Sequence, residues 1–106
     1  SRISVTDLPK HDAAITWNAT PSDSFRVHAV SYGVAGNELC LLVRYEANAA
    51  LTDTVALNRA GDVLHRYVEK TFPEYPQVFR GLALEAFDPQ HPETSWTRLN
   101  PLRPPS

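Results

Sequence analysis

The sequence predicts a small α+β domain, in which a mainly antiparallel sheet of three or four strands carries one amphipathic helix on one face. Three observations support this fold class. Apolar residues recur at helical spacing over residues 56–71, strand-like alternation fills residues 25–47, and turn-forming residues interrupt that alternation. We therefore divide the chain into an N-terminal arm (1–24), a single ββαβ domain (25–88) and a proline-rich extended tail (89–106).

The composition favours one soluble globular domain. The chain has 106 residues, of which 42% are hydrophobic and 21% charged, close to the average for folded domains. Its net charge is -2 with the two signs interspersed, so we expect no nucleic-acid binding, which needs a concentrated positive surface. The longest apolar run, residues 39–43, is far shorter than the roughly 20 residues that span a bilayer, so we expect no membrane-spanning segment.

Methionine is absent from the chain, including its first position. We therefore expect a longer precursor, from which a signal peptide or another upstream segment was removed, with trimming for expression as the alternative. We expect a periplasmic or secreted protein, including a lipoprotein, and a cytoplasmic protein is the alternative. The single cysteine, Cys40, excludes an internal disulfide and a zinc site built from several thiolates.

The N-terminal arm offers one short edge strand. Only residues 15–17 resemble a strand there, and Pro9 and Pro21 bracket them. Proline donates no ladder hydrogen bond and is tolerated at the edges of sheets.

Residues 25–47 predict a hairpin of two half-buried strands. The first strand alternates, with Phe25, Val27 and Ala29 on one side and Arg26 and His28 on the other. The turn is predicted at residues 33–37, because glycine and asparagine tolerate positive φ. A five-residue loop there pairs Tyr32 with Glu38 and Val30 with Cys40.

The second strand of the hairpin alternates more completely. One face carries Leu39, Leu41, Val43, Tyr45 and Ala47, and the other carries Cys40, Leu42, Arg44 and Glu46. The first face is the better floor for a helix, so we expect the second to meet water or a partner, as is common in antiparallel sheets.

The predicted helix over residues 56–71 has one apolar side, formed by Ala56, Leu57, Ala60, Val63, Leu64, Tyr67, Val68 and Thr71. Thr52 and Asp53 are N-cap candidates, and Pro73 ends the helix. Gly61 costs about 0.5–1 kcal/mol relative to alanine in a helix interior, which tertiary burial has to offset.

Residues 77–88 fit two structures. The helical interpretation rests on the spacing of Phe79, Leu82, Ala83, Ala86 and Phe87. A strand is favoured by Gly81 and the flanking prolines, and would return parallel to a neighbour through a right-handed crossover. Beyond Pro89, further prolines predict an extended tail that wraps the domain by Trp96 and Leu99. We expect Trp17 and Trp96 to cap the core, with anchoring of a partner as the alternative.

The sequence shows no pattern of a cofactor enzyme. It has no dinucleotide fingerprint, phosphate-binding loop or nucleophile elbow. The histidines, His11, His28, His65 and His91, lack metal-ligand spacing. On the polar side of the helix, His65 with Glu69 and Asp62 with Arg66 indicate surface ion pairs. We therefore predict no catalytic residue, no cofactor and no metal ion.

The uncovered sheet face is the candidate binding surface. An apolar centre with a charged rim is typical of protein interfaces. The residues predicted to form it are Arg26, His28, Val30, Tyr32, Cys40, Leu42 and Arg44. We predict a non-enzymatic protein-binding module, such as an accessory, inhibitor or immunity-type protein, whose partner is another protein or a second copy of this chain.

The alternative function is a small hydrolase or thiol enzyme that uses Cys40 with His28, because a nearby base favours the reactive thiolate. In the predicted register these residues are diagonal neighbours, roughly 7–8 Å apart. A third interpretation is a purely structural domain, in which the N-terminal arm and Trp17 cover the free face.

Overall fold

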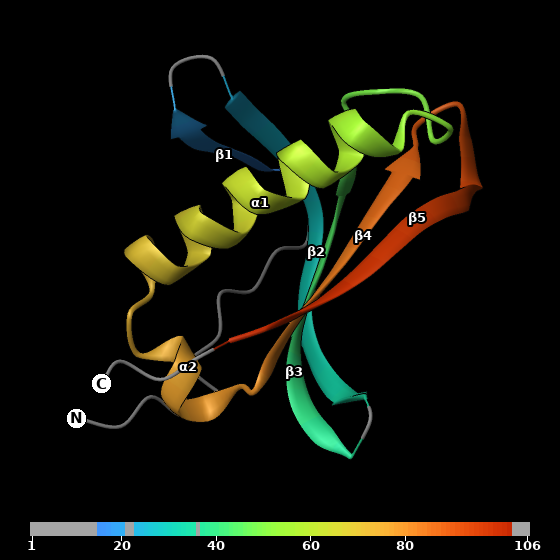
Figure 1. The fold of residues 1–106 in the computed structure, drawn as a ribbon. Coiled ribbons are helices and arrows are strands. Elements are labelled where there is room, and N and C mark those ends of the chain that lie inside the picture. Colours follow the sequence, from blue (N-terminus) through green and yellow to red (C-terminus); the bar gives the residue numbers. More distant parts are fainter. Residues whose placement is uncertain (1–14, 21–22, 36, 103–106) are drawn as a thin grey trace.

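The computed structural model describes residues 15–20, 23–35 and 37–102. They form a five-stranded sheet in the order β1-β2-β3-β4-β5, with the long helix α1 packed along one face (Figure 1). The elements are β1 (Ile15–Thr20), β2 (Asp23–Ala35), β3 (Glu38–Glu46), α1 (Thr54–Thr71), α2 (Tyr75–Val78), β4 (Gly81–Asp88) and β5 (His91–Pro101). The predicted fold class, a small α+β domain with one main helix, is confirmed.

The sheet is antiparallel except where α1 joins two of its strands. β3 and β4 are parallel neighbours, because the intervening helix carries the chain back to the starting edge. The strand interpretation of residues 77–88 is therefore confirmed from Gly81 onward, after the short helix α2. The central order ββαβ agrees with the prediction.

The segment expected to be an extended tail forms a strand instead. β5 pairs antiparallel with β4 and becomes an edge of the sheet. Pro92 and Pro101 lie near its two ends, where an edge strand tolerates a missing amide donor. With β1 at the opposite edge, as expected near residues 15–17, β5 completes the five strands.

α1 follows the predicted amphipathic pattern. The Asp53 carboxylate accepts a hydrogen bond from the Ala56 amide at 3.1 Å and caps the first turn, and the helix stops before Pro73. Its inward side contributes Leu57, Ala60, Gly61, Leu64 and Val68 to the interior. Gly61 is buried, and the Arg98 guanidinium packs closely on it, since a Cβ built at this position would lie 3.1 Å from the guanidinium carbon.

The hydrophobic core lies between α1 and the near face of the sheet. From the sheet it contains Phe25, Val27, Leu41, Val43, Tyr45, Leu82, Leu84 and Ala86. Phe25 packs edge-on against Tyr45, with ring centroids 5.7 Å apart. The face of β3 predicted to support the helix is therefore the one that is buried.

The register of the β2–β3 hairpin differs from the prediction. β2 continues to Ala35, which pairs with Glu38, so the connection is shorter than the predicted five-residue loop. In addition, the register shifts between Val27 and Ala29, where His28 is the extra residue of a β-bulge.

The shortened turn and the bulge change which β2 side chains face α1. Val30 and Tyr32 pair with Val43 and Leu41 and lie on the helix side of the sheet, whereas the prediction placed them on the opposite face. The reason is that an odd shift in register moves every side chain of a strand to the other face. Val30 packs against the core, and Tyr32 remains 49% exposed.

Candidate functional site

The sheet face opposite α1 is not covered by any described helix or strand (Figure 1). An open groove of about 530 Å³ runs across it. We call this surface the free face. Its side chains alternate with those that enter the core, and those lining the groove are Ala29, Ser31, Ala35, Leu42, Arg44, Ala83, Glu85, Thr97 and Leu99.

The centre of the free face is apolar and shallow. Small side chains, Ala29 and Ala83, form its floor between β2 and β4, and Leu42 lies between them on β3. Leu99 of β5 forms one wall and is 55% exposed. Such a surface can receive larger apolar side chains from outside the domain.

One end of the free face carries charged groups that are already paired. The His28 imidazole lies 2.7 Å from the Glu46 carboxylate, which also pairs with Arg26 at 3.2 Å. The Arg44 guanidinium donates to the Glu85 carboxylate at 2.8 Å. These neighbours neutralise one another, so the face combines exposed charge with no excess of either sign.

Phe87 holds this charged end together. Its ring is buried, with the His28 ring packed edge-on at 4.7 Å and the Arg44 guanidinium 4.2 Å above its centroid. Arg44 also donates to the Pro92 carbonyl at 2.9 Å. The aromatic ring therefore orients two of the predicted binding residues.

Four of the seven predicted binding residues lie on the free face. Arg26, His28 and Arg44 gather at its charged end, and Leu42 lies in the groove. The other three are placed differently. Val30 and Tyr32 are on the helix side, for the reason of register given above.

Cys40 alternates with the same side of β3 as Leu42, but its thiol is covered. The residue is only 1% exposed, and a Cβ built on Gly81 would lie 2.9 Å from its sulfur and 3.1 Å from Leu99. The absence of a side chain at Gly81 makes room for the thiol beneath Leu99. Cys40 is therefore a packing residue and contributes no accessible surface.

The geometry gives no support to a reactive pair of Cys40 and His28. The thiol donates toward the Glu38 carbonyl at 3.6 Å, whereas His28 contacts Glu46, six residues along β3. At about 3.3 Å per residue, that separation is ~20 Å. No base therefore stands beside the thiol within the described chain.

The groove residues that the prediction missed come from β4 and β5. Ala83 and Glu85 alternate with the buried residues Leu82, Leu84 and Ala86, and this period of two is a usable signal for a strand over residues 81–88. Thr97 and Leu99 belong to the segment expected to be a tail, whose prolines predicted no strand.

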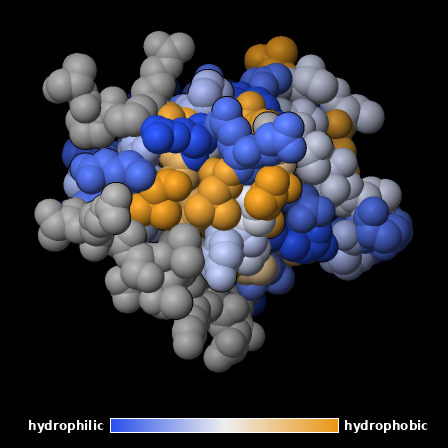
Figure 2. Space-filling model, turned by 90° about the horizontal axis from the view of Figure 1, so that it is seen from below, coloured by the Kyte–Doolittle hydropathy of each residue, from blue (hydrophilic) through white to orange (hydrophobic). Residues whose placement is uncertain are grey.

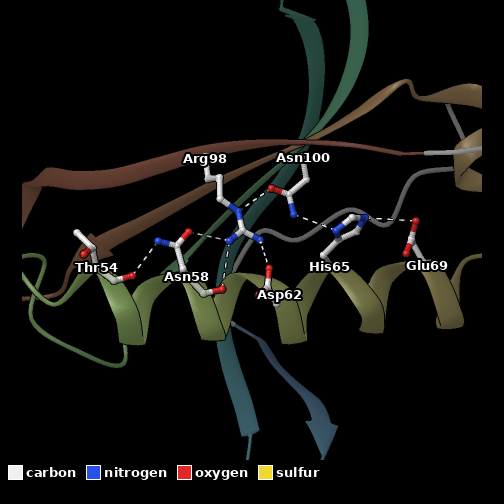
Figure 3. A network of polar contacts seen from close by, with 7 residues as sticks. All are labelled: Thr54, Asn58, Asp62, His65, Glu69, Arg98 and Asn100. Carbon is white, nitrogen blue, oxygen red and sulfur yellow. Dashed lines mark hydrogen bonds and ion pairs between the residues drawn. The ribbon is translucent and has the colours of Figure 1, made fainter.

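A second polar cluster connects α1 with the edge strand β5 (Figure 3). We call it the α1–β5 polar network, and its side chains are Asn58, Asp62, His65, Glu69, Arg98 and Asn100. Arg98 is its centre, because its guanidinium donates to Asp62 at 2.8 Å and to Asn58 Oδ1 at 2.9 Å. The predicted pair of His65 and Glu69 is present at 3.3 Å, whereas Asp62 pairs with Arg98 instead of Arg66.

Tyr45 lies in the core with its hydroxyl buried and without a hydrogen-bond partner among the described residues. Burial raises the pKa of Tyr45 to about 12, and the positive charge of Arg98 opposes this shift. The phenol therefore stays neutral at physiological pH and serves as a packing group.

Within residues 15–20, 23–35 and 37–102, no three His, Cys, Asp or Glu side chains converge as a metal site, and no helix is long and apolar enough to cross a membrane. His11 and the side chain of Trp17 lie outside the described residues, as does most of the N-terminal arm. Trp96 packs partly buried against the core, as expected of a cap. Comparisons with family models, curated proteins and solved structures found no match to this chain.

Proposed function

We propose that this protein is a non-enzymatic protein-binding module, and that its free face receives another protein or a second copy of the chain. The observation that supports this most directly is the open groove of about 530 Å³ across four strands, with an apolar centre beside paired charges. An apolar centre with a polar rim is the usual anatomy of a protein interface.

The shape of the groove favours a macromolecule over a small ligand. Small-molecule sites are concave pockets that enclose most of the ligand and present a few convergent polar groups. Here the groove is open, and the polar groups at its end, Arg44 with Glu85 and His28 with Glu46, bind one another. In this proposal the paired charges set the orientation of the partner on the groove.

The test places a charge in the apolar centre. We expect the double variant Leu42→Asp, Leu99→Asp to lose association by at least about 30-fold, since charged groups are depleted from interface centres and the loss of a central contact costs about 2 kcal/mol or more. Self-association is measured by sedimentation equilibrium, and binding to another protein by titration calorimetry with the purified partner.

Val55→Asp is the matched control. Val55 is 80% exposed, but it lies in the first turn of α1, on the helix layer. This variant should bind like the unmodified chain, and the far-UV circular dichroism of all three proteins should agree. If the double variant associates as tightly as the control, the free face is not the binding surface.

A further inference from the structure

In the α1–β5 polar network, the donor and the acceptor of each hydrogen bond can be assigned, starting from Arg98. The Nε–H of Arg98 can only donate, so the side-chain oxygen of Asn100, 2.6 Å away, must accept. This orients the Asn100 amide so that its NH2 group faces His65 Nδ1 at 2.9 Å. Because the NH2 group can only donate, Nδ1 of His65 must carry no proton (Figure 3).

The other ring nitrogen of His65 faces its own helix. Nε2 is buried and makes no hydrogen bond within the described chain, although the Glu69 carboxylate, one turn later on α1, lies 3.3 Å away as an ion-pair partner. The remaining charged groups of the network are Asp62, one turn earlier on α1, and Arg98 on β5. The neutral ring therefore holds its proton at Nε2, toward Glu69, and uses Nδ1 to hold β5.

We propose that the contact between α1 and β5 is sensitive to pH, and that protonation of His65 at Nδ1 breaks its hydrogen bond to Asn100 and loosens the edge strand. A proton on Nδ1 would point at the NH2 group of Asn100. The amide cannot turn over to accept it, because the NH2 group would then face the Nε–H of Arg98.

Protonation at Nδ1 removes a hydrogen bond between two elements and adds charge to an ion pair within one. The charged imidazole would be attracted to the Glu69 carboxylate 3.3 Å away, but both residues belong to α1, so this attraction does not stabilise β5.

The loosened strand also forms part of the groove. Leu99 precedes Asn100 and lines the free face, and Leu102 is buried and donates its amide to the Arg80 carbonyl at 2.9 Å. The acid form should therefore have a less fixed groove wall. The pH-sensitive contact is a property of the unbound protein, so it is tested without a partner and stands apart from the proposed function.

The experiment is amide hydrogen exchange followed by NMR at pH 7.5 and pH 5.0, with rates corrected for intrinsic chemistry. We expect protection of the Asn100 and Leu102 amides to fall by roughly three- to tenfold at pH 5.0, the change that corresponds to one net hydrogen bond. The amides of Leu41 and Val43 in the central strand β3 should keep their protection. Equal protection of Asn100 at the two pH values would overturn the proposal.

His65→Asn is the decisive variant, because the asparagine side-chain oxygen takes the position of Nδ1 as an acceptor that does not titrate. It should retain protection of β5 at both pH values. His91→Asn, at an exposed position on the same strand, should lose protection at pH 5.0 like the unmodified chain. A fall in protection that persists in His65→Asn, or a ¹⁵N spectrum at pH 7.5 showing the proton on Nδ1, would contradict the mechanism.

Discussion

Substitution of Gly61 by alanine should destabilise this protein, although the same change stabilises an ordinary helix. Alanine is favoured over glycine in a helix interior by about 0.5–1 kcal/mol. Here the added Cβ would lie 3.1 Å from the Arg98 Cζ, whereas carbon atoms pack best at about 3.5–4.0 Å. The guanidinium must therefore retreat by about half an ångström from the helix.

Retreat of the guanidinium strains bonds that now have good geometry. Arg98 donates to Asp62 at 2.8 Å and to Asn58 Oδ1 at 2.9 Å, and hydrogen bonds to charged groups contribute about 1.5–3 kcal/mol when fully formed. Partial loss of these bonds exceeds the gain in helix propensity, so we expect Gly61→Ala to lower the free energy of unfolding by roughly 1 kcal/mol.

A double-mutant cycle measured by urea denaturation separates the two effects. In the Arg98→Ala background no guanidinium opposes the new methyl group, so Gly61→Ala should raise the free energy of unfolding by about 0.5–1 kcal/mol. The coupling between the two positions should thus reach about 1.5 kcal/mol or more, a size expected for residues in contact. Equal effects of Gly61→Ala in the two backgrounds would refute the close packing of Arg98 on α1.

Two further predictions concern the sheet. Gly81→Ala should lower the free energy of unfolding by about 1–3 kcal/mol, because its Cβ would lie 2.9 Å from the Cys40 sulfur. Adding Cys40→Ala should restore part of this loss, as measured by thermal unfolding. If the effects of the two substitutions are simply additive, the prediction is contradicted. The pKa of Tyr45 rises from 10.0 to about 12 on folding, so the folded state retains a proton that the unfolded state loses. Its contribution to stability should therefore be complete below pH 10 and fall by about 1.4 kcal/mol per pH unit between pH 10 and 12. Tyr45→Phe should reduce this slope in urea titrations and cost little at pH 7, because the hydroxyl has no partner in the described chain; an unchanged slope would show that another group is responsible.

The helix and the strand below it were predictable because their patterns are local. The apolar spacing of residues 56–71 and the cap at Asp53 depend on contacts within a few residues, and the structure has both. The alternation over residues 39–47 likewise identified the buried face of β3. The spacing of apolar residues and the capping signal are sufficient to predict a helix or strand when one of its sides packs against the core.

The free face was less predictable because it depends on register. Neither the turn after Ala35 nor the bulge at His28 has a strong local signal, and together they moved Val30 and Tyr32 to the helix side. β5 was not predicted because prolines lie near both ends of residues 91–101. Proline interrupts an interior strand, but it is compatible with an edge strand. Gly61 was a usable clue to the α1–β5 polar network, because a glycine that weakens a helix often makes room for a neighbour.

The exposed apolar residues at the β2–β3 connection are a separate surface. Tyr32 and Val34 are 49% and 75% exposed. Figure 2, a view from below Figure 1, shows hydrophobic surface in a band bordered by hydrophilic side chains. Tyr32 and Val34 lie on the helix side of β2, so the charge substitutions at Leu42 and Leu99 leave these two residues unchanged and test the groove alone.

The parallel pairing of β3 with β4 has a consequence for the order of assembly. The other neighbours in the described sheet are close in sequence, so β1–β2–β3 and β4–β5 can each form as a meander on their own. Joining the two meanders requires closure of the long connection that contains α1, and chain entropy makes such distant contacts slow to form. We therefore expect docking of the helix and zipping of β3 to β4 to occur together as the late, rate-limiting event of folding.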